Sequence, residues 1–226
     1  DSRSGNAGIS YAMIGAALGY PVTISMSGSA SEERKRIIRG YGATIIQTDP
    51  ERGSDGAYET AQSLVEGDPN CFYANQYGNP ENWRAHAATT GPEIWRQTKG
   101  RVTHVVAGVG TGGTLRGIVT ALRGLNPRIA SVAVIPAEAK HQLPGLRHLP
   151  TAMTPAIWDS RYADALQLVS DRAAREMAAR VGRGEGLCIG PSGGAALVAA
   201  EALAARLESG VVVTVLPDSG ERYLSL

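Results

Sequence analysis

The hydrophobic positions of this chain recur with a period of about 3.6 residues in some stretches and about two in others, which are the periods of helices and strands. In the first part of the chain, the pattern predicts helices at 7–18, 31–41 and 55–65 and strands at 20–26, 43–48 and 71–74. Further on, it predicts an interrupted helix over 80–97, helices at 114–123, 171–183 and 193–207, and strands at 102–107, 129–135, 166–169, 187–189 and 211–216. Strands that are separated by helices form parallel sheets, so the predicted fold class is α/β.

The same pattern predicts two domains. A boundary near Asn79 gives a small α/β domain at 1–78 and a larger one at 79–226. The stretch 136–158 is rich in proline and has little periodicity. So long a loop within a compact domain is usually functional or disordered.

The most informative polar segment is the turn of residues 108–114, Gly-Val-Gly-Thr-Gly-Gly-Thr, between a predicted strand and a predicted helix. Its four glycines permit positive φ angles and allow a ligand to approach the main chain closely. The first turn of the following helix leaves N–H groups without intrahelical partners, and the helix dipole favours an anion there. The turn is therefore predicted to bind a phosphate.

Two other interpretations of this turn are open from the residues alone. The spacing Gly108-x-Gly110-x-x-Gly113 also fits the dinucleotide-binding fingerprint, which needs an acidic residue at the end of the next strand. The first acid after that strand is Glu138, which comes late and follows Pro136. A glycine turn without any ligand is the other alternative.

Composition narrows the class of partner to a small molecule. The chain has 226 residues and 43% hydrophobic content, enough for a sizeable core, and its 22 basic against 21 acidic residues indicate no nucleic-acid binding. No apolar run is long enough to span a membrane, and the histidines lack metal-ligand spacing, so we expect neither membrane nor metal. Cys71 and Cys188 lie in strand-like segments and are expected to be buried, reduced thiols, which favours a cytoplasmic protein.

Two further glycine-containing turns precede predicted helices. Ser4-Gly5-Asn6-Ala7-Gly8 offers two polar side chains beside a helix N-terminus, which suits a carboxylate. Gly190-Pro191-Ser192-Gly193-Gly194 offers one hydroxyl at a second helix N-terminus. Ordinary helix capping by these side chains is the alternative.

Together these segments resemble the pyridoxal phosphate enzymes of the cysteine synthase and cystathionine β-synthase family, and the resemblance covers the whole chain. The matching motifs occur in the family's order, at 4–9, 31–34, 76–80, 89–95, 108–114 and 219–225. Within the family, residues 143–150 and 155–159 resemble the B-type cysteine synthase, or O-acetylserine sulfhydrylase. The resemblance implies fold type II, with two open, mostly parallel, twisted sheets flanked by helices as in tryptophan synthase β, and pyridoxal 5′-phosphate as the cofactor.

The resemblance also implies a role for each motif. The cofactor phosphate would be held by Gly110, Thr111, Gly112, Gly113 and Thr114, the pyridine nitrogen by Ser192 and the 3′ oxygen by Asn6. The substrate carboxylate would be received by Ser4, Gly5, Asn6 and Gln76. Arg147 would contact an anionic leaving group or co-substrate, with a solvated loop cation as the alternative.

The implied reaction is a β-replacement on an activated serine, such as O-acetylserine, by a sulfur nucleophile to give L-cysteine. A lyase similar to cystathionine β-synthase or threonine dehydratase, and a catalytically silent family member that binds without turnover, are the alternatives. The resemblance also implies a homodimer, and an interaction with serine acetyltransferase is left open.

The resemblance is incomplete in two respects. The family's Schiff-base lysine precedes the Ser-Gly-Asn turn, whereas Lys35, Lys99 and Lys140 all follow it and are expected to be solvated surface charges. We therefore expect the sequence to belong to a longer protein whose N-terminal piece carries this lysine. The substrate loop also has Arg3 and Ala7 where the family has threonines, so two hydroxyl donors to a carboxylate are missing.

Overall fold

The structure, a computed structural model, describes residues 5–225, and the chain folds into two compact units. The first unit runs to Gln76 and includes the segment that begins at Gly220, and the second spans Tyr77–Ser219. This division differs from the predicted limits of 1–78 and 79–226 mainly in the last residues. They pack with the first unit because, for example, the Ser31 hydroxyl donates to the Arg222 carbonyl at 2.7 Å.

The first unit is a small parallel α/β arrangement. It contains α1 (Asn6–Leu18), β1 (Thr23–Ser27), α2 (Glu32–Gly40), β2 (Thr44–Thr48), α3 (Gly53–Glu66) and the 3-10 segments η1 (Pro50–Arg52) and η3 (Gly220–Tyr223). Strands β1 and β2 pair in parallel, with Thr23 opposite Thr44. The core of this unit includes Ile9, Ala12, Ile24, Met26 and Ile38, so apolar residues of α1, α2 and β1 are buried together.

The second unit contains a four-stranded parallel sheet in the order β5-β4-β3-β6. Its strands are β3 (His104–Gly108), β4 (Ala130–Pro136), β5 (Ala165–Val169) and β6 (Val212–Thr214). Its helices are α4 (Glu81–Ala88), α5 (Thr90–Gln97), α6 (Gly113–Leu125), α7 (Asp171–Glu185) and α8 (Pro191–Ala204), with the 3-10 segment η2 (Ser160–Tyr162). The predicted parallel α/β architecture is therefore confirmed in both units.

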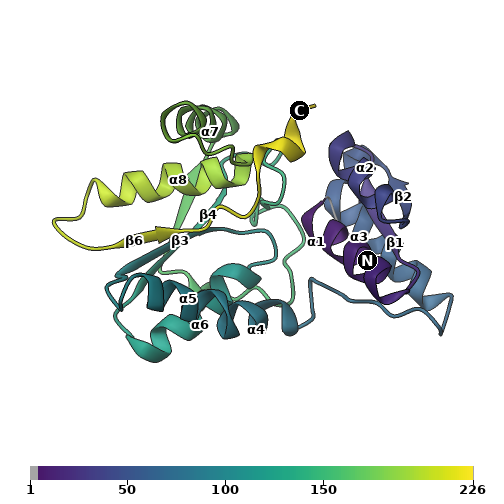
Figure 1. Cartoon of the computed structure of the whole chain (residues 1–226), viewed down its shortest axis with the longest axis horizontal. Helices are drawn as coiled ribbons and strands as arrows, with labels where there is room; N and C mark the ends of the chain where they lie inside the picture. Colours follow the sequence, from purple (N-terminus) through teal and green to yellow (C-terminus); the bar gives the residue numbers. More distant parts are fainter. Residues whose placement is uncertain (1–4, 226) are drawn as a thin grey trace. The chain divides into compact units, whose positions relative to one another are not determined.

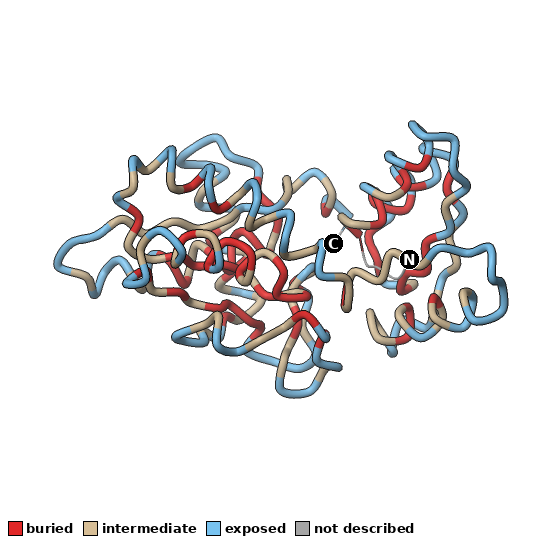
Figure 2. Tube along the Cα trace, turned by 90° about the horizontal axis from the view of Figure 1, so that it is seen from below, coloured by how far each residue is buried: buried red, intermediate tan, exposed pale blue. Residues whose placement is uncertain are grey.

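Helices cover both faces of this sheet because alternate residues of a strand point to opposite sides. Val105 of β3 is buried in a cluster with Leu115 and Ile118 of α6. The next residue, Val106, is buried in the other cluster with Ala195 of α8. Figure 1 accordingly shows α7 and α8 on one side of these strands and α4, α5 and α6 on the other. In Figure 2 the buried residues run through the interior of each unit.

Two predicted strands are wrong. Residues 71–74 form no strand, and 187–189 contribute only an isolated bridge between Ile189 and Ser219. Both segments are apolar enough for a strand, but a strand also needs a neighbour with which to pair, and local sequence does not provide one. As a consequence the prediction of buried thiols is also wrong, because Cys71 and Cys188 are free and exposed.

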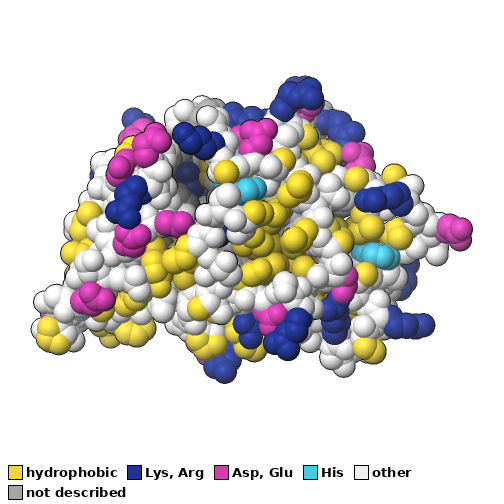
Figure 3. Space-filling view, turned by 180° about the vertical axis from the view of Figure 1, so that it is seen from behind, with side chains coloured by type: hydrophobic (Ala, Val, Ile, Leu, Met, Phe, Trp, Pro, Cys, Tyr) yellow, Lys and Arg dark blue, Asp and Glu magenta, His cyan; other side chains and the backbone are white. Residues whose placement is uncertain are grey.

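No helix within residues 5–225 is long and apolar enough to cross a membrane. On the face shown in Figure 3, basic and acidic side chains are interspersed, and hydrophobic side chains gather between them.

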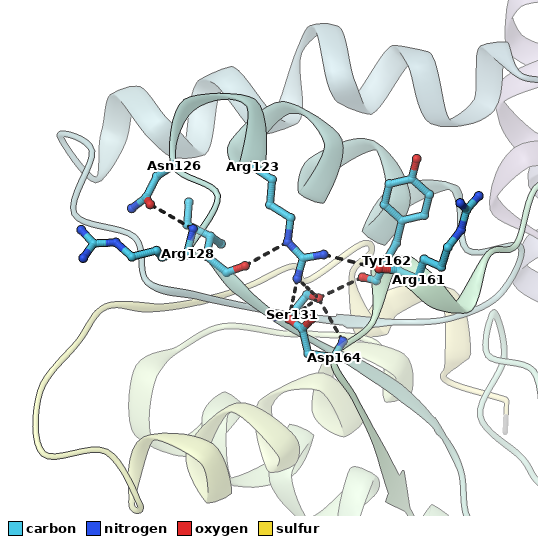
Figure 4. Close-up of polar contacts among 8 residues, drawn as sticks. Arg123, Asn126, Arg128, Ser131, Arg161, Tyr162 and Asp164 are labelled. Carbon is cyan, nitrogen blue, oxygen red and sulfur yellow. Dashed lines mark hydrogen bonds and ion pairs between the residues drawn. The ribbon is translucent and has the colours of Figure 1, made fainter.

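A polar cluster ties the start of β4 to the segment that precedes β5. The Asp164 carboxylate accepts hydrogen bonds from the Ser131 N–H at 2.7 Å and the Ser131 hydroxyl at 3.1 Å. The Arg123 guanidinium of α6 forms an ion pair with the same carboxylate. Figure 4 shows these side chains pointing toward one another.

Replacing Asp164 by alanine is expected to destabilise the protein by about 1–3 kcal/mol, because the fully buried Ser131 would keep an N–H without an acceptor. Urea unfolding of Asp164→Ala against the unmodified protein measures this loss. Glu176→Ala is the matched control, since Glu176 forms an exposed ion pair with Arg172 and is expected to cost less than about 1 kcal/mol. Equal effects of the two substitutions would contradict the assignment.

Candidate functional site

The turn at the carboxyl end of β3 is the centre of the candidate site in the second unit. The strand ends at Gly108 and α6 begins at Gly113, so the turn joins a strand to a helix as predicted. Gly112 is the N-cap of α6 and has a φ of 86°, a left-handed conformation that glycine adopts without steric cost. The N-terminus of α6 therefore follows the glycine turn directly, and the N–H groups of its first turn lie next to those of the turn.

Backbone N–H groups gather in this turn without backbone acceptors. Among residues 5–225, none of the N–H groups of 110–114 donates a hydrogen bond to a backbone carbonyl. Residues 111–113 are nevertheless buried. Buried N–H groups without partners are rare and costly, and the helix dipole adds partial positive charge at the same end. A phosphate fits this set of donors, because its oxygens are acceptors and its charge is negative.

The glycines of the turn are required by its packing. A Cβ on Gly110 would lie 2.4 Å from the Gly145 carbonyl oxygen, and one on Gly113 would lie 1.9 Å from Asn82 Oδ1. Both distances are far below a van der Waals contact. The turn is thus closely supported by the 145 segment and by α4, which fixes the direction of its N–H groups.

Helix α4 holds both threonines of the turn. The Asn82 amide donates to Thr111 Oγ1 at 3.1 Å, and His86 Nε2 lies 3.2 Å from Thr114 Oγ1. Asn82 and His86 are four residues apart, so they lie on one face of the helix. Neither residue was predicted from the sequence as a part of the site. Their spacing on a predicted helix was the signal that could have identified them.

The stability of the protein is expected to fall as the pH drops below about 6.5, in part because of His86. Burial lowers the pKa of His86 below its usual value of 6.5, so the unfolded state takes up a proton before the folded state does. The contribution of neutral, buried His86 to the free energy of unfolding is fully present above the unfolded-state pKa, and it is lost as the pH falls through the folded-state pKa.

Urea unfolding of His86→Gln and of the unmodified protein at pH 5 to 8 is the measurement. The unmodified protein should lose more stability on acidification than the variant. Thr120→Ala, which changes an exposed side chain that carries no ionisable group, is the control, and it should keep the slope of the unmodified protein. Parallel curves for His86→Gln and the unmodified protein would contradict this role for burial.

Arg147 lies next to the turn, but its side chain is not the solvated loop cation that the sequence left open. Its N–H donates to the Val109 carbonyl at 2.9 Å, and the residue is only 5% exposed. The guanidinium donates to the Tyr77 hydroxyl at 2.6 Å and to the Met153 carbonyl at 2.9 Å. It also lies over the Tyr77 ring, 4.9 Å from the centroid. Internal partners therefore replace water around this charge.

Ser192 is buried at the start of α8, with 5% of its surface exposed. Its helix begins beside the segment that follows β6, because the Gly190 N–H donates to the Asp218 carbonyl at 3.1 Å. β6 pairs directly with β3, so the segment that follows β6 and contacts Gly190 leaves the sheet next to the strand that leads to the glycine turn. Gly190 is the N-cap of α8, and no side chain of the described residues caps this helix, so the alternative that Ser192 caps it is wrong.

The Ser-Gly-Asn turn belongs to the first unit. Ser4 lies outside the described residues, whereas Gly5 is the N-cap and Asn6 the first residue of α1. Within 5–225 no side chain caps α1, so capping by Asn6 is also wrong. Asn6 Oδ1 accepts a hydrogen bond from Arg222 Nη1 at 2.6 Å. Gln76, at the end of the first segment of this unit, is partly buried.

One lysine differs from the prediction of solvated surface charges. Lys35 is 4% exposed, and its ammonium donates to the Gly28 carbonyl at 2.8 Å and to the Glu32 carboxylate at 2.7 Å. These two acceptors replace the water that the Lys35 ammonium loses on burial. Lys99 and Lys140 are exposed as predicted.

Comparison with known proteins agrees with this geometry. Residues 1–218 match the family described as pyridoxal-phosphate dependent enzyme. The cysteine synthase of Aquifex aeolicus is 46% identical over all of this chain and 70% of its own length. Cysteine synthase B of Escherichia coli is 37% identical over all of this chain and 74% of its own length. A crystal structure of cysteine synthase from Entamoeba histolytica superimposes with a TM-score of 0.89 at 35% identity, covering 98% of this chain and 68% of that one.

These matches decide between the ligands that the glycine turn left open. A dinucleotide site would need an acid at the end of β4, whereas Glu138 is exposed beyond it, and the matching family is described by its dependence on pyridoxal phosphate. The parallel sheets flanked by helices are those of fold type II, and pyridoxal phosphate is the cofactor of the family, as predicted. With its sequence matched over nearly its whole length, the chain belongs to the family of pyridoxal-phosphate dependent enzymes.

Proposed function

We propose that this protein is a transferase that forms L-cysteine by β-replacement on an activated serine, such as O-acetylserine, with a sulfur nucleophile. One structural observation carries the proposal: among the described residues, the N–H groups of 110–114 donate to no backbone carbonyl, which leaves them for a phosphate. The relatives named cysteine synthases support the choice of reaction. When bound, pyridoxal phosphate supplies an electron sink that makes bonds at the substrate's α-carbon easier to break.

The proposed roles of the cofactor-binding residues follow from their chemistry. Gly110, Thr111, Gly112, Gly113 and Thr114 would bind the phosphate. Ser192, as a neutral hydroxyl, would hydrogen-bond the pyridine nitrogen without stabilising a proton on it, which makes the ring a weaker electron sink. A weaker sink suits the elimination of a β-substituent. The Asn6 amide would contact the 3′ oxygen.

The proposed roles of the substrate-binding residues concern anions. Ser4, Gly5, Asn6 and Gln76 would receive the substrate carboxylate, and a role of Arg147 toward an anionic leaving group remains a prediction. The internal bonds of the Arg147 guanidinium to Tyr77 and Met153 are consistent with an indirect role, in which the arginine shapes the loop beside the phosphate turn. We also propose a cytoplasmic homodimer, as the resemblance implies.

Absorbance of the purified protein tests the proposal. A visible band after addition of pyridoxal phosphate that changes on adding O-acetylserine, and cysteine formed with sulfide, are the expected results. Cystathionine formed with homocysteine instead would indicate the lyase alternative. A colourless protein without response would contradict the proposal and support the catalytically silent alternative.

The same sample addresses the lysine that this chemistry requires. The intact mass is compared with the 23.6 kDa of the sequence. Borohydride reduction followed by peptide mapping then identifies the amine to which the cofactor is attached. Attachment at Lys35 is not expected, because its ammonium is bound to Gly28 and Glu32.

A further inference from the structure

A hydrogen bond within the first unit joins the last residues of the chain to the Ser-Gly-Asn turn. Arg222 Nη1 donates to Asn6 Oδ1 at 2.6 Å, a short distance of the kind found in charge-assisted hydrogen bonds. The two residues are 216 positions apart in the sequence. The contact therefore depends on the docking of η3 against α1 and α2.

This bond determines which way the Asn6 amide faces. A guanidinium has only N–H donors, so the amide must present its oxygen, and not its nitrogen, to Arg222. The amide plane is rigid, and its NH2 group is then directed away from Arg222. The NH2 group is a donor, so a ligand atom that contacts it must be an acceptor. An anionic oxygen meets this requirement, whereas a hydroxyl that points its own hydrogen at Asn6 does not.

Arg222 is itself held by buried groups at the start of α2, from its N-cap Ser31 and from Arg34. The Ser31 hydroxyl donates to the Arg222 carbonyl at 2.7 Å and accepts from Arg34 Nε at 2.8 Å. Arg34 is 3% exposed and lies over the ring of Tyr223, 5.0 Å from its centroid. The backbone position of Arg222 is therefore set by a cluster inside the unit.

The same cluster supports the backbone of the turn. A Cβ on Gly5 would lie 2.3 Å from Arg34 Nη1, so the arginine packs directly on the main chain before Asn6. Both the backbone and the side-chain amide of the turn are thus oriented by arginines that come from other elements.

We propose that Arg222 is a positioning residue for Asn6: it binds the amide oxygen and thereby directs the amide NH2 group as a donor toward an anionic oxygen of the ligand. This inference rests on the proposed function, which assigns Asn6 to the 3′ oxygen of pyridoxal phosphate. Arg222 does not touch the ligand in this role, and its effect passes through Asn6.

Titration of the purified protein with pyridoxal phosphate tests the proposal, with the absorption maximum of the bound cofactor as a second readout. Arg222→Met is expected to weaken cofactor binding about tenfold and to shift the absorption maximum, as the loss of orienting partners behind a ligand-binding group commonly does. Arg222→Lys should restore part of the affinity, because an ammonium still donates one hydrogen bond. Arg39→Met, on the exposed side of α2, should match the unmodified protein.

A double-mutant cycle separates positioning from a general loss of structure. In the Asn6→Ala background, adding Arg222→Met should cause no further loss of affinity and no further shift of the absorption maximum. Additive losses, or an Arg222→Met variant that binds and absorbs like the unmodified protein, would overturn the inference. If Arg222→Met does not fold, Arg222→Lys completes the same cycle.

The unmodified protein distinguishes a failure of the inference from a failure of the proposed function. If it does not bind pyridoxal phosphate, the proposed function fails and the inference fails with it. If it binds the cofactor but Arg222→Met has no effect, only the inference fails.

Discussion

Replacement of Gly110 by alanine is expected to weaken the binding of pyridoxal phosphate by about 100-fold or more. The added Cβ would lie 2.4 Å from the Gly145 carbonyl oxygen, which belongs to the backbone and cannot rotate away. The turn must therefore shift, and its N–H groups lose their common direction. Hydrogen bonds to a charged group contribute about 1.5–3 kcal/mol each, so the loss of two of them accounts for an effect of this size.

Gly124→Ala is the matched control for this substitution. Gly124 lies near the end of α6, and a Cβ there meets no atom of the described residues within 4 Å. Alanine is expected to stabilise the helix by about 0.5–1 kcal/mol and to leave cofactor binding unchanged. Fluorescence titration gives the affinities, and thermal unfolding shows whether Gly110→Ala remains folded. A folded Gly110→Ala protein with unaltered affinity would remove the glycine turn from the phosphate site.

Replacement of Arg147 by alanine is expected to destabilise the second unit by about 2–4 kcal/mol. The substitution leaves the Tyr77 hydroxyl and the Met153 carbonyl without the guanidinium, removes a cation–π contact and opens a cavity. The desolvation of one buried charge is relieved, but the loss of the two hydrogen bonds and the empty volume outweigh it. The backbone bond from residue 147 to the Val109 carbonyl is kept in the variant, so the loss of side-chain packing should loosen the segment beside the glycine turn without detaching it.

Chemical unfolding of Arg147→Ala and of two companions measures this effect. Arg128→Ala removes an exposed arginine of the same unit and should change the stability by less than about 0.5 kcal/mol. Tyr77→Phe removes only the hydroxyl, and its effect should overlap with that of Arg147→Ala in the double variant. Fully additive effects, or an Arg147→Ala protein as stable as Arg128→Ala, would contradict the internal role of the arginine.

The agreement between sequence and structure is best where the signal is local. The turn 108–114 can be recognised because glycines, threonines and a strand-to-helix transition are all contained in one short segment. The helices are likewise found within a few residues of their predicted limits, since periodicity and helix-end residues are properties of the segment itself.

The disagreements occur where a residue's environment comes from elsewhere in the chain. Cys71 and Cys188 lie in segments apolar enough for strands, yet no neighbouring strand of the described residues pairs with them and both thiols are exposed. Lys35 has the spacing of a solvated helix residue, yet the Gly28 carbonyl makes its burial tolerable. The exposure of the thiols depends on which strands pair, and the burial of Lys35 depends on how α2 packs on the segment after β1, and hydrophobic periodicity reveals neither.

The α/β class, the glycine turn between a strand and a helix, and the family can all be read from the residues alone, because each depends on short patterns and their order along the chain. The side chains that support that turn and the Ser-Gly-Asn turn emerge only from the folded molecule. Asn82 reaches Thr111, Arg147 reaches Tyr77 and Arg222 reaches Asn6 across 29, 70 and 216 positions. Such contacts depend on how helices and loops pack on the sheets, and a hydrogen bond between distant residues leaves no periodic trace in the sequence.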